Sequence, residues 1–88
     1  MEKNEEVYPG KIWIKPEAYR SRFIKVTRKE DNKSMLLAIE AIDCIEPMTL
    51  SSLKQGKMVT DEWSRITIRR NKMYEVVEHI EYFIMSGL

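Results

Sequence analysis

The sequence predicts a small α+β protein, mainly β, with an antiparallel sheet of four or five strands and a short C-terminal helix. Three observations predict this class. The apolar run 36–47 contains two short strands around a polar break, and the alternating segment 65–70 follows about twenty residues later. After residue 77 the spacing of apolar residues changes from the two-residue period of a strand to that of a helix.

The size and composition of the chain limit what it can build. Its 88 residues are 43% hydrophobic and 33% charged, which is the composition of a globular domain. A domain of this size buries roughly 60–65% of its unfolded surface, so a deep, water-excluding active site is hard to build. We expect a flexible N-terminal tail over residues 1–10 and a single domain over residues 11–88. The net charge of +1 predicts no strong general attraction to nucleic acid or to a membrane.

Nothing in the sequence indicates export or a membrane span. The polar, acidic first residues differ from a secretory signal, and no apolar stretch approaches the roughly 18 residues of a spanning helix. Cys44 is the single cysteine, so no disulfide can form within the chain. These observations predict a cytoplasmic protein.

The first two strands are predicted from alternation. Isoleucines alternate with other side chains over residues 11–15, and Pro16 ends this short strand. Proline also suits a first helical position, so one helical turn is expected over 16–19. Residues 23–28 alternate and are rich in β-branched side chains, and the polar cluster 29–33 predicts a turn after them.

The apolar run then returns the chain across the sheet. Residues 35–38 form the returning strand, a break follows at residues 40–41 or at Asp43, and residues 42–45 form the next strand. Because proline has no N–H for a ladder hydrogen bond, we expect Pro47 to end the pairing.

Residues 48–61 have the weakest pattern. The polar residues at 51–52 and 55–56 mark a loop or a hairpin tip. A structureless loop of this length is unusual in so small a domain. We therefore expect part of it to be an extended hairpin arm, from residue 58 toward residue 63.

The phase of the apolar residues predicts the closing hairpin. Its buried face is expected to hold four residues: Ile66, Ile68, Tyr74 and Val76. A two-residue turn would mix the faces, whereas a three-residue connection over 70–72 sets Ile68 opposite Tyr74. We expect Asn71 or Lys72 to adopt the left-handed conformation in this connection.

A short helix is expected to follow the hairpin and to lie on the sheet. Four apolar residues have helical spacing: Val77, Ile80, Phe83 and Ile84. They predict two helical turns. Gly87 is the expected C-terminal cap, since glycine adopts the left-handed conformation that ends many helices.

The run 36–47 reads Leu-Leu-Ala-Ile-Glu-Ala-Ile-Asp-Cys-Ile-Glu-Pro. It resembles the L-I-N-L-D-N-I-x-x-I-E-P stretch of small β-rich proteins related to the flagellar and swarming-motility family FlbD. Segments 65–68 and 74–81 resemble the closing hairpin and the start of the helix in that group, so the resemblance covers residues 23–84. It implies an architecture more than a function, because the family has no agreed catalytic activity. Its look-alikes suggest a bacterial motility, phage or mobile-element context.

The sequence predicts neither catalysis nor a cofactor. A metal site needs several converging ligands, and His79 is the single histidine, so we expect it at the surface where the helix starts. Cys44 lies in an apolar run and is expected to be a small buried hydrophobe rather than a reactive thiol. No glycine-rich phosphate loop occurs in the sequence. We therefore expect a protein that is not an enzyme, with no cofactor, metal or evident small-molecule substrate.

One sheet face is a candidate binding surface. If Ile66 and Ile68 point inward, alternate residues of that strand share the outer face, and a second strand adds to it. The candidate surface has six members: Trp63, Arg65, Thr67, Arg69, Lys25 and Thr27. Cationic side chains beside an aromatic platform are typical of sheets that hold single-stranded nucleic acid. The alternative is a solvated face whose charges discourage aggregation.

Protein contacts are the function that the sequence favours. A thin sheet with two tryptophans and six methionines leaves apolar surface that is hard to cover. Trp13 is the candidate interface anchor, since tryptophan is enriched in interface hot spots, unless the preceding segment folds over the rings. We expect a non-catalytic interaction or regulatory module that contacts proteins, with a homodimer as one form. Binding of single-stranded RNA or DNA by the basic face is the alternative.

Overall fold

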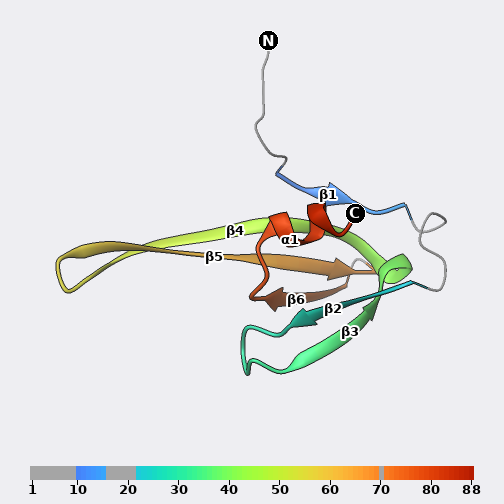
Figure 1. Ribbon diagram of the computed structural model, residues 1–88, viewed down its shortest axis with the longest axis horizontal. Helices are drawn as coiled ribbons and strands as arrows, with labels where there is room; N and C mark the ends of the chain where they lie inside the picture. Colours follow the sequence, from blue (N-terminus) through green and yellow to red (C-terminus); the bar gives the residue numbers. More distant parts are fainter. Residues whose placement is uncertain (1–9, 16–21, 70) are drawn as a thin grey trace, which may run out of the picture.

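The computed structural model describes residues 10–15, 22–69 and 71–88, and it confirms a mainly β fold with one short helix (Figure 1). The elements in chain order are β1 (Ile12–Trp13), β2 (Phe23–Thr27), β3 (Ser34–Ala38), the 3-10 turn η2 (Ile39–Ala41), β4 (Ile42–Lys54), β5 (Lys57–Ile68), β6 (Lys72–Val76) and α1 (Ile80–Met85). One antiparallel sheet has the order β1-β4-β5-β6, and β2 and β3 form a second, two-stranded sheet. The predicted tail, apart from Gly10, and the predicted turn at 16–19 lie outside the described residues.

The two sheets meet along β6. Arg28, directly after β2, forms an antiparallel bridge with Val76 of β6. The backbone N–H of Lys29 donates to the carbonyl of Glu75 over 2.8 Å. At the other end β3 passes through η2 into β4, at the polar break that the sequence predicts. Strands β2 and β3 therefore curve around one side of the four-stranded sheet. The helix α1 packs against β4 (Figure 1).

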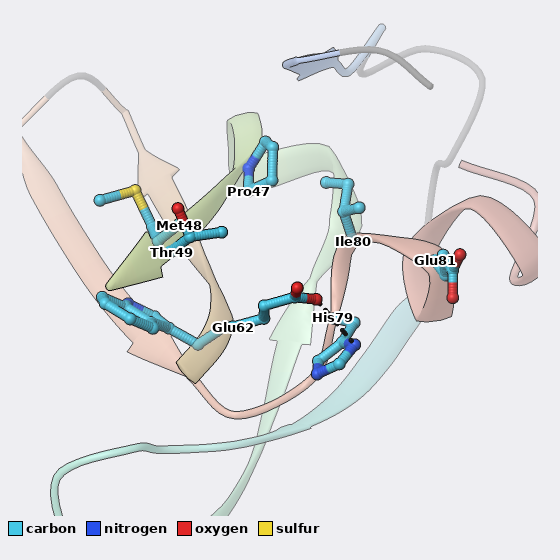
Figure 2. A pocket seen from close by; sticks show the side chains of 8 residues that line it. Pro47, Met48, Thr49, Glu62, His79, Ile80 and Glu81 are labelled. Atoms are coloured by element: carbon cyan, nitrogen blue, oxygen red, sulfur yellow. Dashed lines mark ion pairs between the residues drawn. The ribbon is translucent and has the colours of Figure 1, made fainter. Parts of the chain in front are cut away.

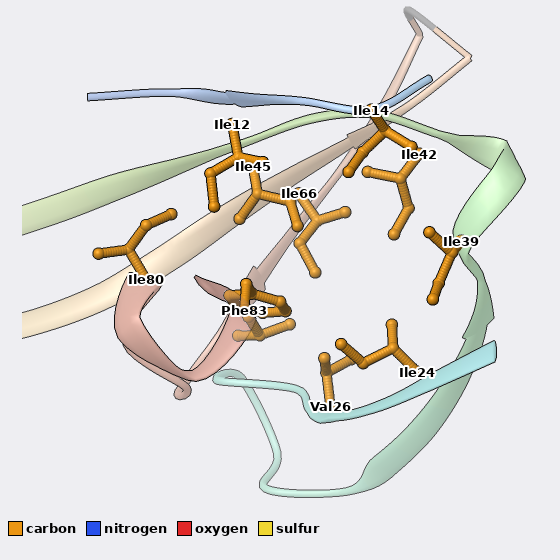
Figure 3. Close-up of a cluster of buried hydrophobic side chains, with 11 residues drawn as sticks. Ile12, Ile14, Ile24, Val26, Ile39, Ile42, Ile45, Ile66, Ile80 and Phe83 are labelled. Carbon is orange, nitrogen blue, oxygen red and sulfur yellow. The ribbon is translucent and has the colours of Figure 1, made fainter. Parts of the chain in front are cut away.

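Buried side chains from strands, turn and helix converge on one core (Figure 3). The cluster consists of Ile12, Ile14, Ile24, Val26, Ile39, Ile42, Ile45, Ile66, Val76, Ile80 and Phe83. Ile42 and Ile45 both face it although they lie three residues apart, because the register shifts between Ile42 and Cys44. A bulge of this kind adds one residue and restores the phase of the strand.

The helix is shorter than predicted and begins at Ile80 rather than Val77. The N–H of Val77 donates to the carbonyl of Thr27 over 2.9 Å, so Val77 continues the pairing between the end of β6 and the end of β2. His79 is the N-cap residue and is exposed, which confirms its predicted place at the helix start. Gly87 has a φ of +90°, which confirms it as the left-handed residue after the helix.

The prediction that Pro47 ends a strand is wrong, because β4 continues through it to Lys54. The pair Lys54–Lys57 closes a two-residue turn, so it is a hydrogen-bonded pair, and every second pair after it is of the same kind. In this alternation the backbone nitrogen of Pro47 points away from β5, toward the other edge of β4. On that edge β1 pairs with β4 only as far as Ile45, so among the described residues no strand lies beside Pro47. The missing N–H therefore costs no ladder hydrogen bond.

Most of the weakly patterned segment 48–61 belongs to a paired hairpin arm that projects from the body (Figure 1). The arm comprises residues 49–62, in register from Thr49 opposite Glu62 to the tip. Gln55 and Gly56 have φ values of +50° and +77°, as a two-residue type I′ turn requires. The predicted tip at 55–56 is confirmed, whereas residues 51–52 lie inside β4.

The closing hairpin has the predicted three-residue connection, but it is shifted by one position. Ile68 pairs with Lys72, so the connection covers 69–71 rather than 70–72. The shift changes each cross-strand partner by two positions along β6. Because side chains alternate with a period of two, the buried face is still the predicted one. The partners on the outer face are different from those predicted.

We expect Phe83→Ala to lower the free energy of unfolding by about 3–5 kcal/mol, because Phe83 is fully buried in the core. Met85→Ala in the same helix is the matched control, since Met85 is 87% exposed and its loss changes stability by less than about 0.5 kcal/mol. Urea unfolding followed by far-ultraviolet circular dichroism measures both. Equal losses in the two variants would contradict the assigned helix face.

Candidate interaction surface

The outer face is the side of the four-stranded sheet opposite the core. Trp63, Arg65 and Thr67 of β5 lie on it, because they alternate with the buried residues Ser64 and Ile66. Three members of the candidate binding surface are therefore brought together, as the phase of the strand predicts.

A row of alternating charges crosses the outer face. The ammonium group of Lys11 lies 3.4 Å from Glu46, and Arg65 lies 3.8 Å from the other oxygen of Glu46. The Nε of Arg65 donates to Oε2 of Glu75 over 2.8 Å. We call Lys11, Glu46, Arg65 and Glu75 the charge row. Two cations and two anions balance, so this part of the outer face is not cationic.

The pKa values reflect the pairing of Arg65 with Glu75. The hydrogen bond to Glu75, and then the attraction between the opposite charges, raise the pKa of Arg65 above its ordinary value. Partial burial acts to raise the pKa of Glu75. The hydrogen bonds from Arg65 and Trp63 outweigh it, and they hold the pKa of Glu75 below its ordinary value.

Trp63 is half-buried and does not offer an open platform. Its indole Nε1 donates a hydrogen bond to Oε1 of Glu75. The ammonium group of Lys29 lies 4.6 Å from the centre of its ring, within the range of a cation–π contact. The indole is thus engaged at its edge and on one face by groups of its own chain.

The other three candidates lie apart from this group. Lys25 and Thr27 belong to β2, in the second sheet. The N–H and hydroxyl of Thr27 both donate to the carboxylate of Glu78 over 2.9 Å. Arg69 follows β5 with a φ of +50°, so it takes the left-handed conformation expected at Asn71 or Lys72. The face of β5 therefore ends before Arg69.

Trp13 is 69% exposed beside β4 on the outer face. It pairs with Cys44 and lines an open hollow that also includes Thr67. Lys11 lies 5.1 Å from the ring centre. Cys44 is 6% exposed, which confirms the predicted small buried residue. Trp13 is therefore an exposed aromatic side chain on the sheet, as an interface anchor requires.

A small pocket of about 260 Å³ lies where the arm leaves the body (Figure 2). Its walls include Pro47 and Met48 from β4, and Ile80 from the start of α1. Nδ1 of His79 lies 3.7 Å from Oε1 of Glu62 across the pocket. Within the described part of the chain, no group of three or more histidine, cysteine or carboxylate side chains is placed to hold a metal ion.

The arm exposes apolar side chains that the sequence analysis did not single out. Leu50, Leu53 and Met58 are 59%, 69% and 68% exposed. Among the described residues, no strand pairs with β5 on its second edge before Ser64, where β6 begins to pair. The weak pattern of residues 48–61 concealed this surface. The signal for it was the Gln-Gly pair flanked by two lysines.

Comparison of the chain with protein-family models, curated proteins and solved structures gave no match. The resemblance to the FlbD family stays a prediction. Across the described residues, no helix is long and apolar enough to cross a membrane.

We expect Glu75→Gln to reduce the dependence of stability on pH. Because the folded pKa of Glu75 lies below the ordinary value of 4.5, its contribution is present above that value and is lost as the pH falls through the folded pKa. The Glu75 side chain is 39% exposed, so this contribution is below about 1 kcal/mol. Urea unfolding at pH 7 and at about pH 3 measures it.

Glu30→Gln is the control for this measurement, because Glu30 is exposed in the turn after β2. The wild type and the control should lose the same stability on acidification, and Glu75→Gln should lose less. If Glu75→Gln loses as much stability between the two pH values as the wild type does, the Glu75 carboxylate makes no pH-dependent contribution to stability.

Proposed function

We propose that this protein is a non-catalytic cytoplasmic interaction module that acts through protein–protein contacts and self-associates as a homodimer. The observation that carries the proposal is the arm, a ribbon with unpaired edges and exposed apolar side chains at Leu50, Leu53 and Met58. An isolated two-stranded hairpin is only marginally stable in water, so a long one gains stability when another surface covers it. Exposed sheet edges are also sites where chains add to one another.

Trp13 supports the same proposal from the outer face. It is 69% exposed, and the hollow beside it is lined by both charged and apolar side chains. A large aromatic residue with polar neighbours is the usual composition of an interface core and its rim. The outer face and the arm therefore both offer surfaces suited to a protein partner.

The charges on the outer face favour a protein over a nucleic acid as the partner. Arg65 lies between Glu46 and Glu75, so its charge is neutralised within the sheet. Lys29 is placed over Trp63 and occupies a face on which a base would stack. Binding of single-stranded RNA or DNA would have to displace both contacts.

We expect the wild type to sediment as a dimer at high concentration and to dissociate on dilution. Sedimentation velocity from about 5 to about 500 µM spans the affinities that a small interface gives. Combining Leu50→Ser, Leu53→Ser and Met58→Ser should weaken association at least about tenfold, because it removes apolar area from the contact. A wild type that stays monomeric over this range would contradict the homodimer.

The matched control for this variant is Leu36→Ser. Leu36 is 65% exposed on β3, away from the arm, so the same chemical change there should leave association unchanged. Weakening by this control to the same extent would place the contact outside the arm.

For the nucleic-acid alternative, we expect no saturable change of tryptophan fluorescence when single-stranded RNA or DNA is added. The titration is done in about 50 mM and about 200 mM salt, because contacts to phosphate weaken strongly over this range. Salt-sensitive binding that Arg65→Ala abolishes would instead favour the basic outer face. Lys33→Ala, in the turn before β3, is the control for a general loss of charge.

A further inference from the structure

We propose that two copies of this chain pair edge to edge along the arm portion of β5, around a two-fold axis at Val59. The inference rests on the proposed homodimer and specifies which strand and which register form it. The second copy is the occupant, because the sequence of this edge is complementary to itself when it runs antiparallel.

The phase of the ladder makes the β5 edge ready to pair. Because Lys54 and Lys57 form the hydrogen-bonded pair that closes the turn, Met58, Thr60 and Glu62 point their backbone N–H and C=O groups away from β4. The same phase continues at Ser64, whose groups pair with Val76 of β6. Within the described part of the chain, the backbone groups of residues 58–62 thus form an unpaired row of donors and acceptors. Further along β5, the continuation of this row pairs with β6.

The edge of β4 is less suited to this pairing. In the same phase Pro47 belongs to the outward-pointing row and has no N–H to donate. Proline on an edge is one of the devices by which proteins prevent strand addition. The β5 edge has no proline between Lys57 and Ser64. Pro47 lies outside the arm, so it limits only how far a strand added to β4 could extend toward the body. Within the arm, residues 50–54 of β4 have no acidic side chain, whereas residues 57–61 of β5 contain both Lys57 and Asp61. Charge complementarity therefore favours pairing along β5 over pairing along β4.

Charge selects the register. With the axis at Val59, Lys57 lies directly opposite Asp61 of the second copy, and the symmetry repeats this pair. Neither residue has an ion-pair partner among the described residues of its own chain. An axis at Lys57 or at Asp61 would place like charges opposite each other, which is destabilising.

The side chains around the axis agree with this register. Lys57, Val59 and Asp61 share one face of the arm, so two valines meet at the centre with an ion pair on each side. On the other face, the exposed Met58 lies opposite Thr60 of the second copy. The pairing covers residues 57–61 and ends before Trp63, which is engaged within its own chain.

A charge exchange tests the register. Lys57→Glu and Asp61→Lys each create two repulsive pairs across the axis, and each should raise the dimer dissociation constant about tenfold. The double variant K57E/D61K restores opposite charges and keeps the net charge, so its dissociation constant should lie within about threefold of the wild type. Lys33→Glu makes the same change of net charge as Lys57→Glu, but away from the arm, and should have no effect.

A cysteine placed on the axis tests the geometry independently. Val59→Cys should give a covalent dimer on mild oxidation, because the two thiols meet at a pair that is not hydrogen-bonded, where side chains are closest. Ser52→Cys is the control, since Ser52 lies opposite Val59 on β4 and is one strand further from the axis. The wild type, with Cys44 buried, should not cross-link.

The outcomes separate this inference from the proposed homodimer. A wild type that dimerises while the single charge variants have no effect, or while K57E/D61K remains weak, overturns the β5 pairing and leaves self-association intact. Cross-linking through Ser52→Cys but not Val59→Cys overturns it in favour of the β4 edge. A monomeric wild type overturns both.

Discussion

The antiparallel ladder between β4 and β5 is the constraint on which the rest of the structure depends. Its register sets Ile45 opposite Ile66, and both are fully buried at the centre of the core. A slip of one residue would turn these side chains to the outer face and remove the core. The same alignment sets Glu46 opposite Arg65 and extends the hairpin to its turn. Core, charge row and arm are therefore consequences of one register.

The outer face carries several charged side chains, yet the charges of the row cancel one another. Strands β4, β5 and β6 each contribute one charge to the row, and Lys11 lies directly before β1. Neighbouring charges in the row have opposite signs. Cross-strand pairs of this kind support the alignment of the strands while leaving the face wet. Lys29 brings a further cation from the end of β2, and its contact with Trp63 helps to join the second sheet to the first.

The two edges of the β4–β5 hairpin differ in a way that bears on association. Just before the arm, Pro47 removes a donor from the β4 edge, whereas β5 retains its donors until it pairs with β6 at Ser64. A small domain with little core gains stability when a second chain pairs with its sheet. The exposed apolar side chains of the arm are then the surface that such a contact would cover.

The sequence by itself determined the fold class, the buried face of the closing hairpin, the break before β4 and the cap at Gly87, because these follow from side-chain period and local backbone preference. Tertiary structure decided the rest. Whether Pro47 ended its strand depended on which neighbour lay beside its nitrogen, and local sequence carries no information about that neighbour. The predicted register, with Ile68 opposite Tyr74, would set Glu75 opposite Thr67. The one-position shift of the turn sets Glu75 opposite Arg65 instead, and this pairing neutralises the face that the sequence suggested was basic.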